Sequence, residues 1–190
     1  GGVQYMTAGR GIIHSEMPQQ EEGLLWGFQL WVNLASKDKF QPARYRDISK
    51  DEIPQVTINS STTAKVIAGR LRGESELVEG PVVRADIEMQ MYDVQGRSGM
   101  HDLTLSDTSR GFLYVFDGEL MANGTRVERG QIATFGQGER LTVTIKTSAR
   151  YLLLAGKPIG EPIVQYGPFV MNTQEEIEQA INEYQTGSLA

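Results

Sequence analysis

The chain has 190 residues, with 18 Lys and Arg against 24 Asp and Glu, two His and no Cys. The net charge of −6 argues against nucleic acid or an anionic membrane surface as a direct partner, because both are bound through clustered cations. The lack of Cys excludes disulfides and thiolate chemistry, and no run approaches the roughly 20 apolar residues of a spanning helix. We therefore expect a cytoplasmic protein, which would also be nuclear if the source is eukaryotic.

The first third of the chain contains strand-like runs that are rich in branched and aromatic residues and separated by polar breaks. Val3–Ala8 predicts a strand, and Gly9-Arg10-Gly11 a turn. Ile12–Met17 predicts a second strand and Leu24–Leu34 a long one with both Trp residues. The polar stretch Lys37–Asp51 predicts a loop with one helical turn.

A regular series of short strands follows. The clearest local signal is Asn123-Gly124, because both positions of this two-residue turn tolerate a positive φ. Turn signals at roughly 8–12-residue spacing indicate a β-sandwich or barrel. The predicted strands are Val56–Ile58, Ala64–Ala68, Val82–Met91, Leu103–Leu105, Phe112–Phe116, Glu119–Ala122, Thr125–Val127, Gln131–Phe135, Leu141–Ile145 and Tyr151–Ala155.

One helix is predicted near the C-terminus. Thr173 can cap it, and Glu176 lies three residues on, which makes a capping box. The apolar face, which repeats at helical spacing, consists of Ile177, Ala180, Ile181 and Tyr184. Gly187 predicts the end of the helix.

The chemistry-bearing pattern is His14-Ser15-Glu16 within a predicted strand. Side chains two apart on a strand point to the same face, so the imidazole and the carboxylate can converge. This pair of donors suits a first-row divalent metal. Two ligands do not make a tight site, and the alternative is an ordinary surface pair.

Two long motifs give the chain a family resemblance. Residues 2–17, GVQYMTAGRGIIHSEM, with Pro18 resemble the second cupin motif of the pirin family, and FQLWVNL at residues 28–34 resembles the strand that follows it. PARY at residues 42–45 resembles the family's connecting segment. GPFVMNT at residues 167–173 resembles the pirin C-terminal signature.

The resemblance implies an all-β tandem cupin, made of jelly-roll barrels, with the first barrel incomplete and a C-terminal helix. It implies that residues 1–52 are the later part of the N-terminal cupin with its linker, residues 53–170 the C-terminal cupin, and residues 171–190 the helix and tail. Pirins hold one metal, usually iron, in the N-terminal barrel through three His and one Glu. His14 and Glu16 match two of these ligands, and the H-x-H that supplies the others would precede residue 1. We therefore expect an Fe(II) site, which would be empty if those ligands are missing.

The resemblance also suggests roles for other residues. Glu16 would be both a ligand and the base that takes the substrate proton. Gln29 would be a hydrogen-bonding group near the metal or in contact with the substrate, with a satisfied buried amide as the alternative. Met6 and Trp31 could line the pocket, but ordinary core packing is the preferred explanation for each. His101, the second His of the chain, is expected to be a hydrogen-bonded residue in a turn.

Three functions compete. The first is a quercetin 2,3-dioxygenase-like oxidoreductase that acts on a flavonol. The second is a redox-sensitive regulatory protein that binds transcription factors or metabolic enzymes. The third is a truncated, inactive chain.

Overall fold

The computed structural model describes residues 1–17, 22–83, 88–106 and 108–189. The chain divides into two compact units, one of residues 1–5 and 47–158 and the other of residues 6–46 and 159–190. Among the described residues no helix is long and apolar enough to cross a membrane. The elements, in chain order, are β1 Val3–Thr7, α1 Ser36–Lys39, β2 Arg44–Ile48, the 3-10 helix η1 Lys50–Glu52, β3 Gln55–Asn59, β4 Thr62–Ala68, β5 Arg70–Arg72, β6 Leu77–Glu79, β7 Met89–Thr104, β8 Arg110–Ala122, β9 Thr125–Glu128, β10 Ile132–Phe135, β11 Arg140–Gly156, β12 Val164–Tyr166, β13 Phe169–Met171 and α2 Gln174–Thr186.

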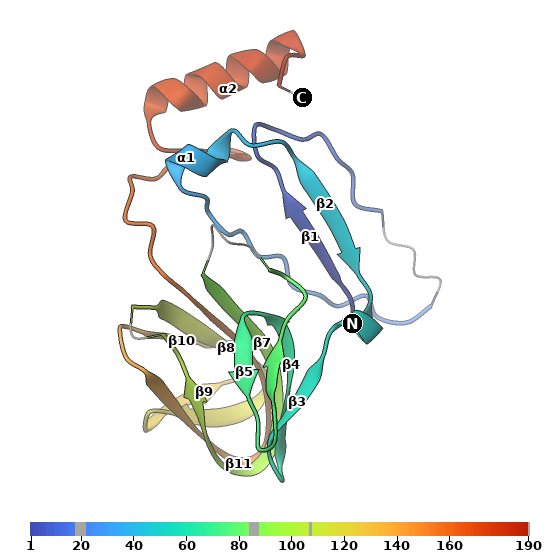
Figure 1. Cartoon of the computed structure of the whole chain (residues 1–190), viewed down its shortest axis with the longest axis vertical. Helices are drawn as coiled ribbons and strands as arrows, with labels where there is room; N and C mark the ends of the chain where they lie inside the picture. The colour runs from blue at the N-terminus through green and yellow to red at the C-terminus, as the bar shows by residue number, and fades with distance from the viewer. Residues whose placement is uncertain (18–21, 84–87, 107, 190) are drawn as a thin grey trace. The chain divides into compact units, whose positions relative to one another are not determined.

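The first unit is built on an antiparallel seven-stranded sheet with the order β10-β8-β11-β7-β4-β3 and with β9 added to β8 (Figure 1). Its three long strands, β7, β8 and β11, lie side by side in the order β8-β11-β7. The register of β11 on β7 shifts between Ile145 and Ser148, where a β-bulge interrupts the ladder. A bulge bends a strand and increases its twist without ending it, so β11 remains one continuous strand across this interruption.

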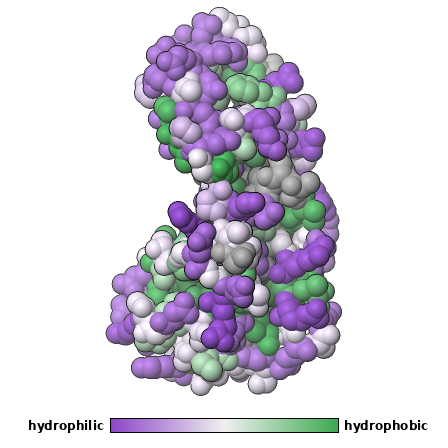
Figure 2. All heavy atoms as spheres, turned by 60° about the vertical axis from the view of Figure 1, so that its left-hand side comes forward, coloured by the Kyte–Doolittle hydropathy of each residue, from purple (hydrophilic) through white to green (hydrophobic). Residues whose placement is uncertain are grey.

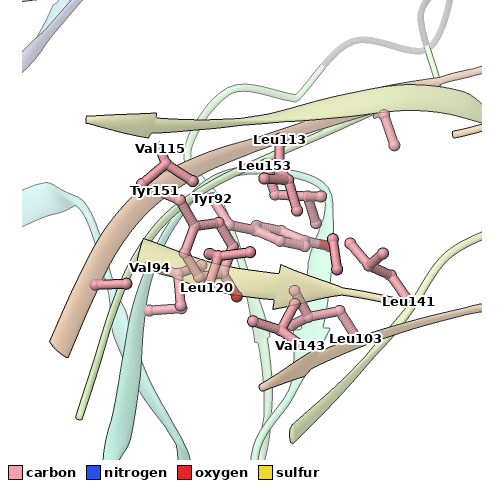
Figure 3. Packing of buried hydrophobic residues seen from close by; sticks show 14 of the residues in the cluster. Tyr92, Val94, Leu103, Leu113, Val115, Leu120, Leu141, Val143, Tyr151 and Leu153 are labelled. Carbon is pink, nitrogen blue, oxygen red and sulfur yellow. The ribbon is translucent and has the colours of Figure 1, made fainter. Parts of the chain in front are cut away.

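The core of this unit lies between the long strands. Tyr92, Leu113, Tyr151 and Leu153 are fully buried, and their side chains point toward one another in Figure 3. The Tyr92 hydroxyl donates to the Arg70 carbonyl at 2.6 Å, so this buried polar group is satisfied. Burial raises the pKa of Tyr92 to about 12, which keeps the phenol neutral.

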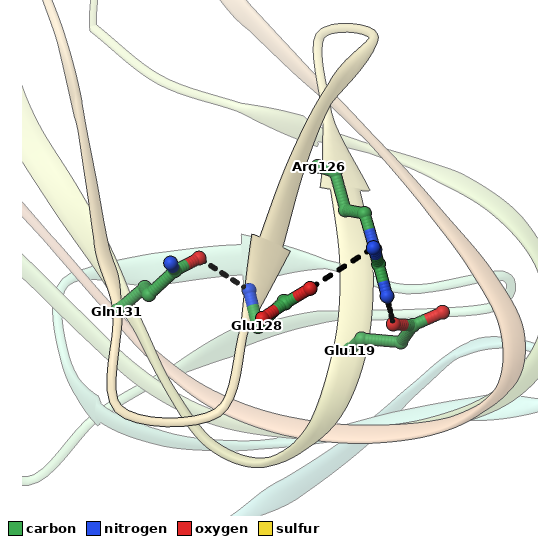
Figure 4. Close-up of polar contacts among 4 residues, drawn as sticks. All are labelled: Glu119, Arg126, Glu128 and Gln131. Carbon is green, nitrogen blue, oxygen red and sulfur yellow. Dashed lines mark hydrogen bonds and ion pairs between the residues drawn. The ribbon is translucent and has the colours of Figure 1, made fainter.

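The predicted hairpin is confirmed at β8 and β9. Asn123 and Gly124 have φ values of 45° and 81°, which is the left-handed backbone that this turn requires. Arg126 lies on the exposed face of the hairpin between Glu119 and Glu128 (Figure 4), and its Nη1 is 3.0 Å from Glu128 Oε1. The hydrogen bond and charge of Arg126 lower the pKa of Glu119.

The second unit contains the helix α2 and the β12–β13 hairpin. The capping box is confirmed: Thr173 Oγ1 accepts from the Glu176 N–H at 3.2 Å, and Glu176 Oε2 accepts from the Thr173 N–H at 3.1 Å. Ile177 and Ala180 are buried against Met171. The helix ends at Gly187, whose φ is 72°, as predicted.

Two predicted strands are wrong. Ile12–Met17 and Leu24–Leu34 belong to none of the sheets that the described residues form. A strand exists only where a neighbour completes its ladder, and residue periodicity carries no information about that neighbour.

Further differences concern strand boundaries. The loop predicted at Lys37–Asp51 contains the expected helical turn, α1, but also the strand β2. The predicted strands Leu141–Ile145 and Tyr151–Ala155 are parts of the single strand β11. Of the strand predicted at Val82–Met91, residues 84–87 lie outside the described residues, and β7 begins at Met89.

Candidate metal-binding site

His14 and Glu16 converge in the structure. His14 Nε2 lies 3.7 Å from Glu16 Oε1, and the two side chains are 41% and 60% exposed. The backbone here is not a strand, so strand alternation is not the cause of this proximity. The proximity expected from the sequence is present, but the strand geometry from which it was expected is not.

A tight turn leads into this segment. Gly9 has a φ of 58°, and the Gly11 N–H donates to the Ala8 carbonyl at 3.0 Å. The Arg10 N–H donates to the Gln41 carbonyl at 2.9 Å. These hydrogen bonds fix the backbone of Arg10 and Gly11, so the segment that carries His14 and Glu16 starts from a defined backbone conformation.

The side chains of His14 and Glu16 are of the chemical types that bind a divalent metal, but two ligands are too few for a closed site. A neutral imidazole nitrogen and a carboxylate oxygen are ligands that Fe, Mn and Zn accept. Within the described parts of the chain, however, no group of three or more His, Cys, Asp or Glu residues could hold a metal. A closed site would therefore need donors in addition to His14 and Glu16.

The other predicted site residues lie on different local structures. Met6 is part of β1 and half-buried. Gln29 and Trp31 are exposed and lie outside any strand, with 63% of Trp31 accessible. Their assignment to a substrate pocket stays a prediction.

The sequence analysis missed Lys39, which is almost fully buried. Its Nζ donates to Asn33 Oδ1 at 2.7 Å and to the Val170 carbonyl at 3.0 Å. Burial lowers the pKa of Lys39, while the charges of Glu161 and Glu176 act in the opposite direction. This cation ties the end of the segment that carries Gln29 and Trp31 to β13, and nothing in its polar sequence context signals the burial.

His101 also differs from its prediction. It lies in the strand β7 and is buried, not placed in a turn. Its Nε2 is 2.8 Å from the Tyr151 hydroxyl, and the two rings stack with centroids 6.3 Å apart. Burial lowers the pKa of His101 and favours the neutral imidazole. The alternation of residue types could have indicated this burial. Leu103 lies between the polar residues Asp102 and Thr104, and His101 shares the face of Leu103 in a strand.

Comparison with known proteins identifies the family. The family model described as the pirin C-terminal cupin domain matches residues 91–190, and the model described as pirin matches residues 1–32. The chain is 47% identical over 194 residues to the Pseudomonas aeruginosa protein named "Putative quercetin 2,3-dioxygenase PA3240", covering all of this chain and 68% of that protein. The chain belongs to the pirin family. It is also 35% identical to human pirin, covering 97% of this chain and 63% of that protein.

Two solved structures are similar to this pirin chain in fold. The chain is similar to a crystal structure of quercetin 2,3-dioxygenase from Acinetobacter baumannii, with a TM-score of 0.76 and 29% identity over 84% of this chain and 55% of that one. A structure from Geobacillus kaustophilus gives a TM-score of 0.72 and 30% identity over 85% of this chain and 66% of that one. The chain thus spans between about half and two thirds of the length of these relatives. Its mostly β architecture with one C-terminal helix is the expected cupin fold, with the first barrel incomplete.

Proposed function

We propose that this chain is the part of a pirin-type, metal-dependent dioxygenase that supplies His14 and Glu16 to one divalent metal, with a flavonol such as quercetin as the substrate class. The observation that carries the proposal is the 3.7 Å approach of His14 Nε2 to Glu16 Oε1, within the segment that matches the pirin family model. The names of the P. aeruginosa and A. baumannii relatives support the reaction type. Iron(II) is the metal that we propose.

The chemistry of such a metal is that of a Lewis acid and a template for the substrate. His14 would hold it through a neutral ring nitrogen, and Glu16 would hold it through one carboxylate oxygen. The second oxygen of Glu16 is then free to accept the proton of a flavonol hydroxyl. Because both side chains are accessible, a flat aromatic substrate can reach the pair.

The remaining pocket residues would act on the flavonol rings. Trp31 offers a face for aromatic stacking, and Met6 offers a polarisable thioether. Gln29 can donate or accept one hydrogen bond to a ring substituent. We also propose the domain division expected from the sequence, at residues 52 and 170.

The activity is tested on the protein that contains this chain. It is loaded with Fe(II) or Mn(II), its bound metal is measured, and the loss of flavonol absorbance is followed in the presence of O₂. We expect His14→Ala to lose metal and activity together. Glu16→Gln should lose activity more completely than metal, because an amide oxygen can still bind but cannot take the proton.

Glu79→Gln is the matched control for Glu16→Gln, since Glu79 is a half-exposed carboxylate paired with Arg70 far from the proposed ligands in sequence. Unchanged flavonol absorbance in protein with measured, bound metal would contradict the proposed reaction. Metal analysis of the 190-residue chain alone tests the inactive-chain hypothesis: near-stoichiometric metal would rule that hypothesis out.

A further inference from the structure

The last residues of the chain fold together with its first residues. Residues 159–190 form one compact unit with residues 6–46, although more than a hundred residues separate the two in sequence. We call the described part, residues 159–189, the C-terminal segment. It contains β12, β13 and α2, and α1 lies next to α2 in Figure 1.

Lys39 joins the C-terminal segment to α1 through a buried charge. Charged side chains normally lie at the surface, and hydrophilic residues are frequent on the face that Figure 2 shows, yet Lys39 is only 5% exposed. Its Nζ donates to Asn33 Oδ1 and to the Val170 carbonyl. Because a buried ammonium group must keep its acceptors, these two bonds hold Asn33 and Val170 at fixed positions around one atom.

Glu161 makes a second connection to α1. Its Oε2 accepts from the Ser36 N–H at 2.7 Å and from Asn172 Nδ2 at 3.0 Å. The charges of Glu161 and Glu176 also favour the ammonium form of Lys39, whereas burial lowers the pKa of Lys39. The C-terminal segment is therefore bound to α1 by two different side chains.

Leu189 contacts the chain at a second place. It is buried and lies so close to Gly11 that a side chain on Gly11 would overlap it. The C-terminal segment thus contacts the chain at Gly11 and again at Ser36 and Lys39. The residues proposed to bind the metal or the flavonol that lie between these two places are His14, Glu16, Gln29 and Trp31.

We infer that the C-terminal segment positions the residues proposed to bind the metal and the flavonol. Leu189 fixes the chain three residues before His14, and Lys39, through Asn33, fixes it two residues after Trp31. Contacts outside a ligand set tune affinity by orienting the ligands. Leu189 therefore acts on the metal ligands and Lys39 on the flavonol side of the site. The inference rests on the proposed function, since it assigns both contacts to that site.

The first test needs no metal. The amides of Arg10 and Gly11 have the Gln41 and Ala8 carbonyls as acceptors, so their hydrogen exchange reports the turn that Leu189 contacts. In the 190-residue chain, Leu189→Ala should accelerate the exchange of both amides, because the turn loses its packing. Unchanged exchange would overturn the inference.

The second test uses the protein that contains this chain. The dissociation constants for Fe(II) and Mn(II) are measured by competition with a chelator, and KM is measured for quercetin. Leu189→Ala should raise the metal dissociation constant about tenfold, as expected when a contact that orients a ligand is lost. Leu189→Met keeps a similar apolar volume and should restore the wild-type constant. Lys39→Met should raise KM and leave the metal dissociation constant unchanged.

Val127→Ala is the matched control. Val127 is 3% exposed in β9, which belongs to the other compact unit, so this variant loses core packing and should keep both constants. Equal effects in Val127→Ala would show general destabilisation and overturn the inference, as would unchanged constants in Leu189→Ala and Lys39→Met. A wild-type protein that binds neither metal would instead overturn the proposed function, and this inference with it.

Discussion

Leu189 packs directly against Gly11. A Cβ on Gly11 would lie 2.5 Å from Leu189 Cγ and 2.9 Å from the Leu189 carbonyl oxygen. Leu189 therefore contacts the turn that lies three residues before His14. This contact gives the C-terminal tail a means of fixing the start of the proposed ligand segment.

Gly11→Ala should destabilise this contact strongly. The methyl group would overlap Leu189, and Gly11 has a φ of 143°, which side chains rarely adopt. Overpacking and backbone strain together predict a loss of about 2–4 kcal/mol in unfolding free energy, measured by urea denaturation. Gly136→Ala, which adds a methyl group into open space without a positive φ, should change stability by less than about 0.5 kcal/mol. Equal losses in the two variants would refute the contact.

Lys39→Met should weaken the connection between the segment ending at Asn33 and β13. The substitution keeps the buried apolar stem but leaves Asn33 Oδ1 and the Val170 carbonyl without their donor. Each unsatisfied acceptor costs about 1–3 kcal/mol, and hydrogen exchange at Asn33 and Val170 should accelerate together. Lys37→Met is the control, because the Lys37 side chain is 79% exposed and should be nearly neutral. Unchanged exchange in Lys39→Met would exclude the proposed role.

The elements predicted correctly are those whose signals are local. The Asn123-Gly124 turn and the capping box of Thr173 and Glu176 act over four residues or fewer, so the sequence shows them in full. Leu141–Ile145 and Tyr151–Ala155 were predicted as two strands, but they form one strand, whose ladder is interrupted by a bulge between Ile145 and Ser148.

The elements predicted wrongly depend on partners distant in sequence. Ile12–Met17 and Leu24–Leu34 have strand composition, yet a ladder needs a neighbour that composition does not specify. The proximity of His14 and Glu16 and the turn at Gly9-Arg10-Gly11 were both predicted, but the strand expected after this turn is absent. The buried amine of Lys39 gave no sequence signal, because its acceptors come from residues 6 and 131 positions away.

The stability of the chain should fall in mildly acidic solution because of His101. Burial holds the pKa of His101 below the 6.5 of an unfolded imidazole. As the pH falls through about 6.5, the unfolded state therefore binds the proton first, and the free energy of unfolding decreases until the pH passes the folded pKa. His101 Nδ1 is buried without a hydrogen-bond partner among the described residues, so a proton there is poorly compensated.

The measurement for His101 is urea denaturation at several pH values between 5 and 8. His101→Gln should be less stable at pH 8 and show a flatter pH dependence below 6.5. If that variant does not fold, the ring resonances of His101 in the wild-type chain provide the same test. An imidazole that titrates at or above 6.5 in the folded chain would contradict the argument.

Thr173→Ala should cost about 1 kcal/mol of stability, as expected when an N-cap hydroxyl is removed. The hydroxyl accepts from the Glu176 N–H at 3.2 Å. This N–H lies in the first turn of the helix, where no backbone carbonyl of the helix can accept from it. Thr173→Ser keeps the oxygen and should retain most of the stability, which separates the cap from the loss of the methyl group. Because Ile177 and Ala180 pack against Met171, fraying at Thr173 should also accelerate hydrogen exchange in the first turn of α2 and in β13. A Thr173→Ser variant as unstable as Thr173→Ala would show that the hydroxyl does not act as the cap.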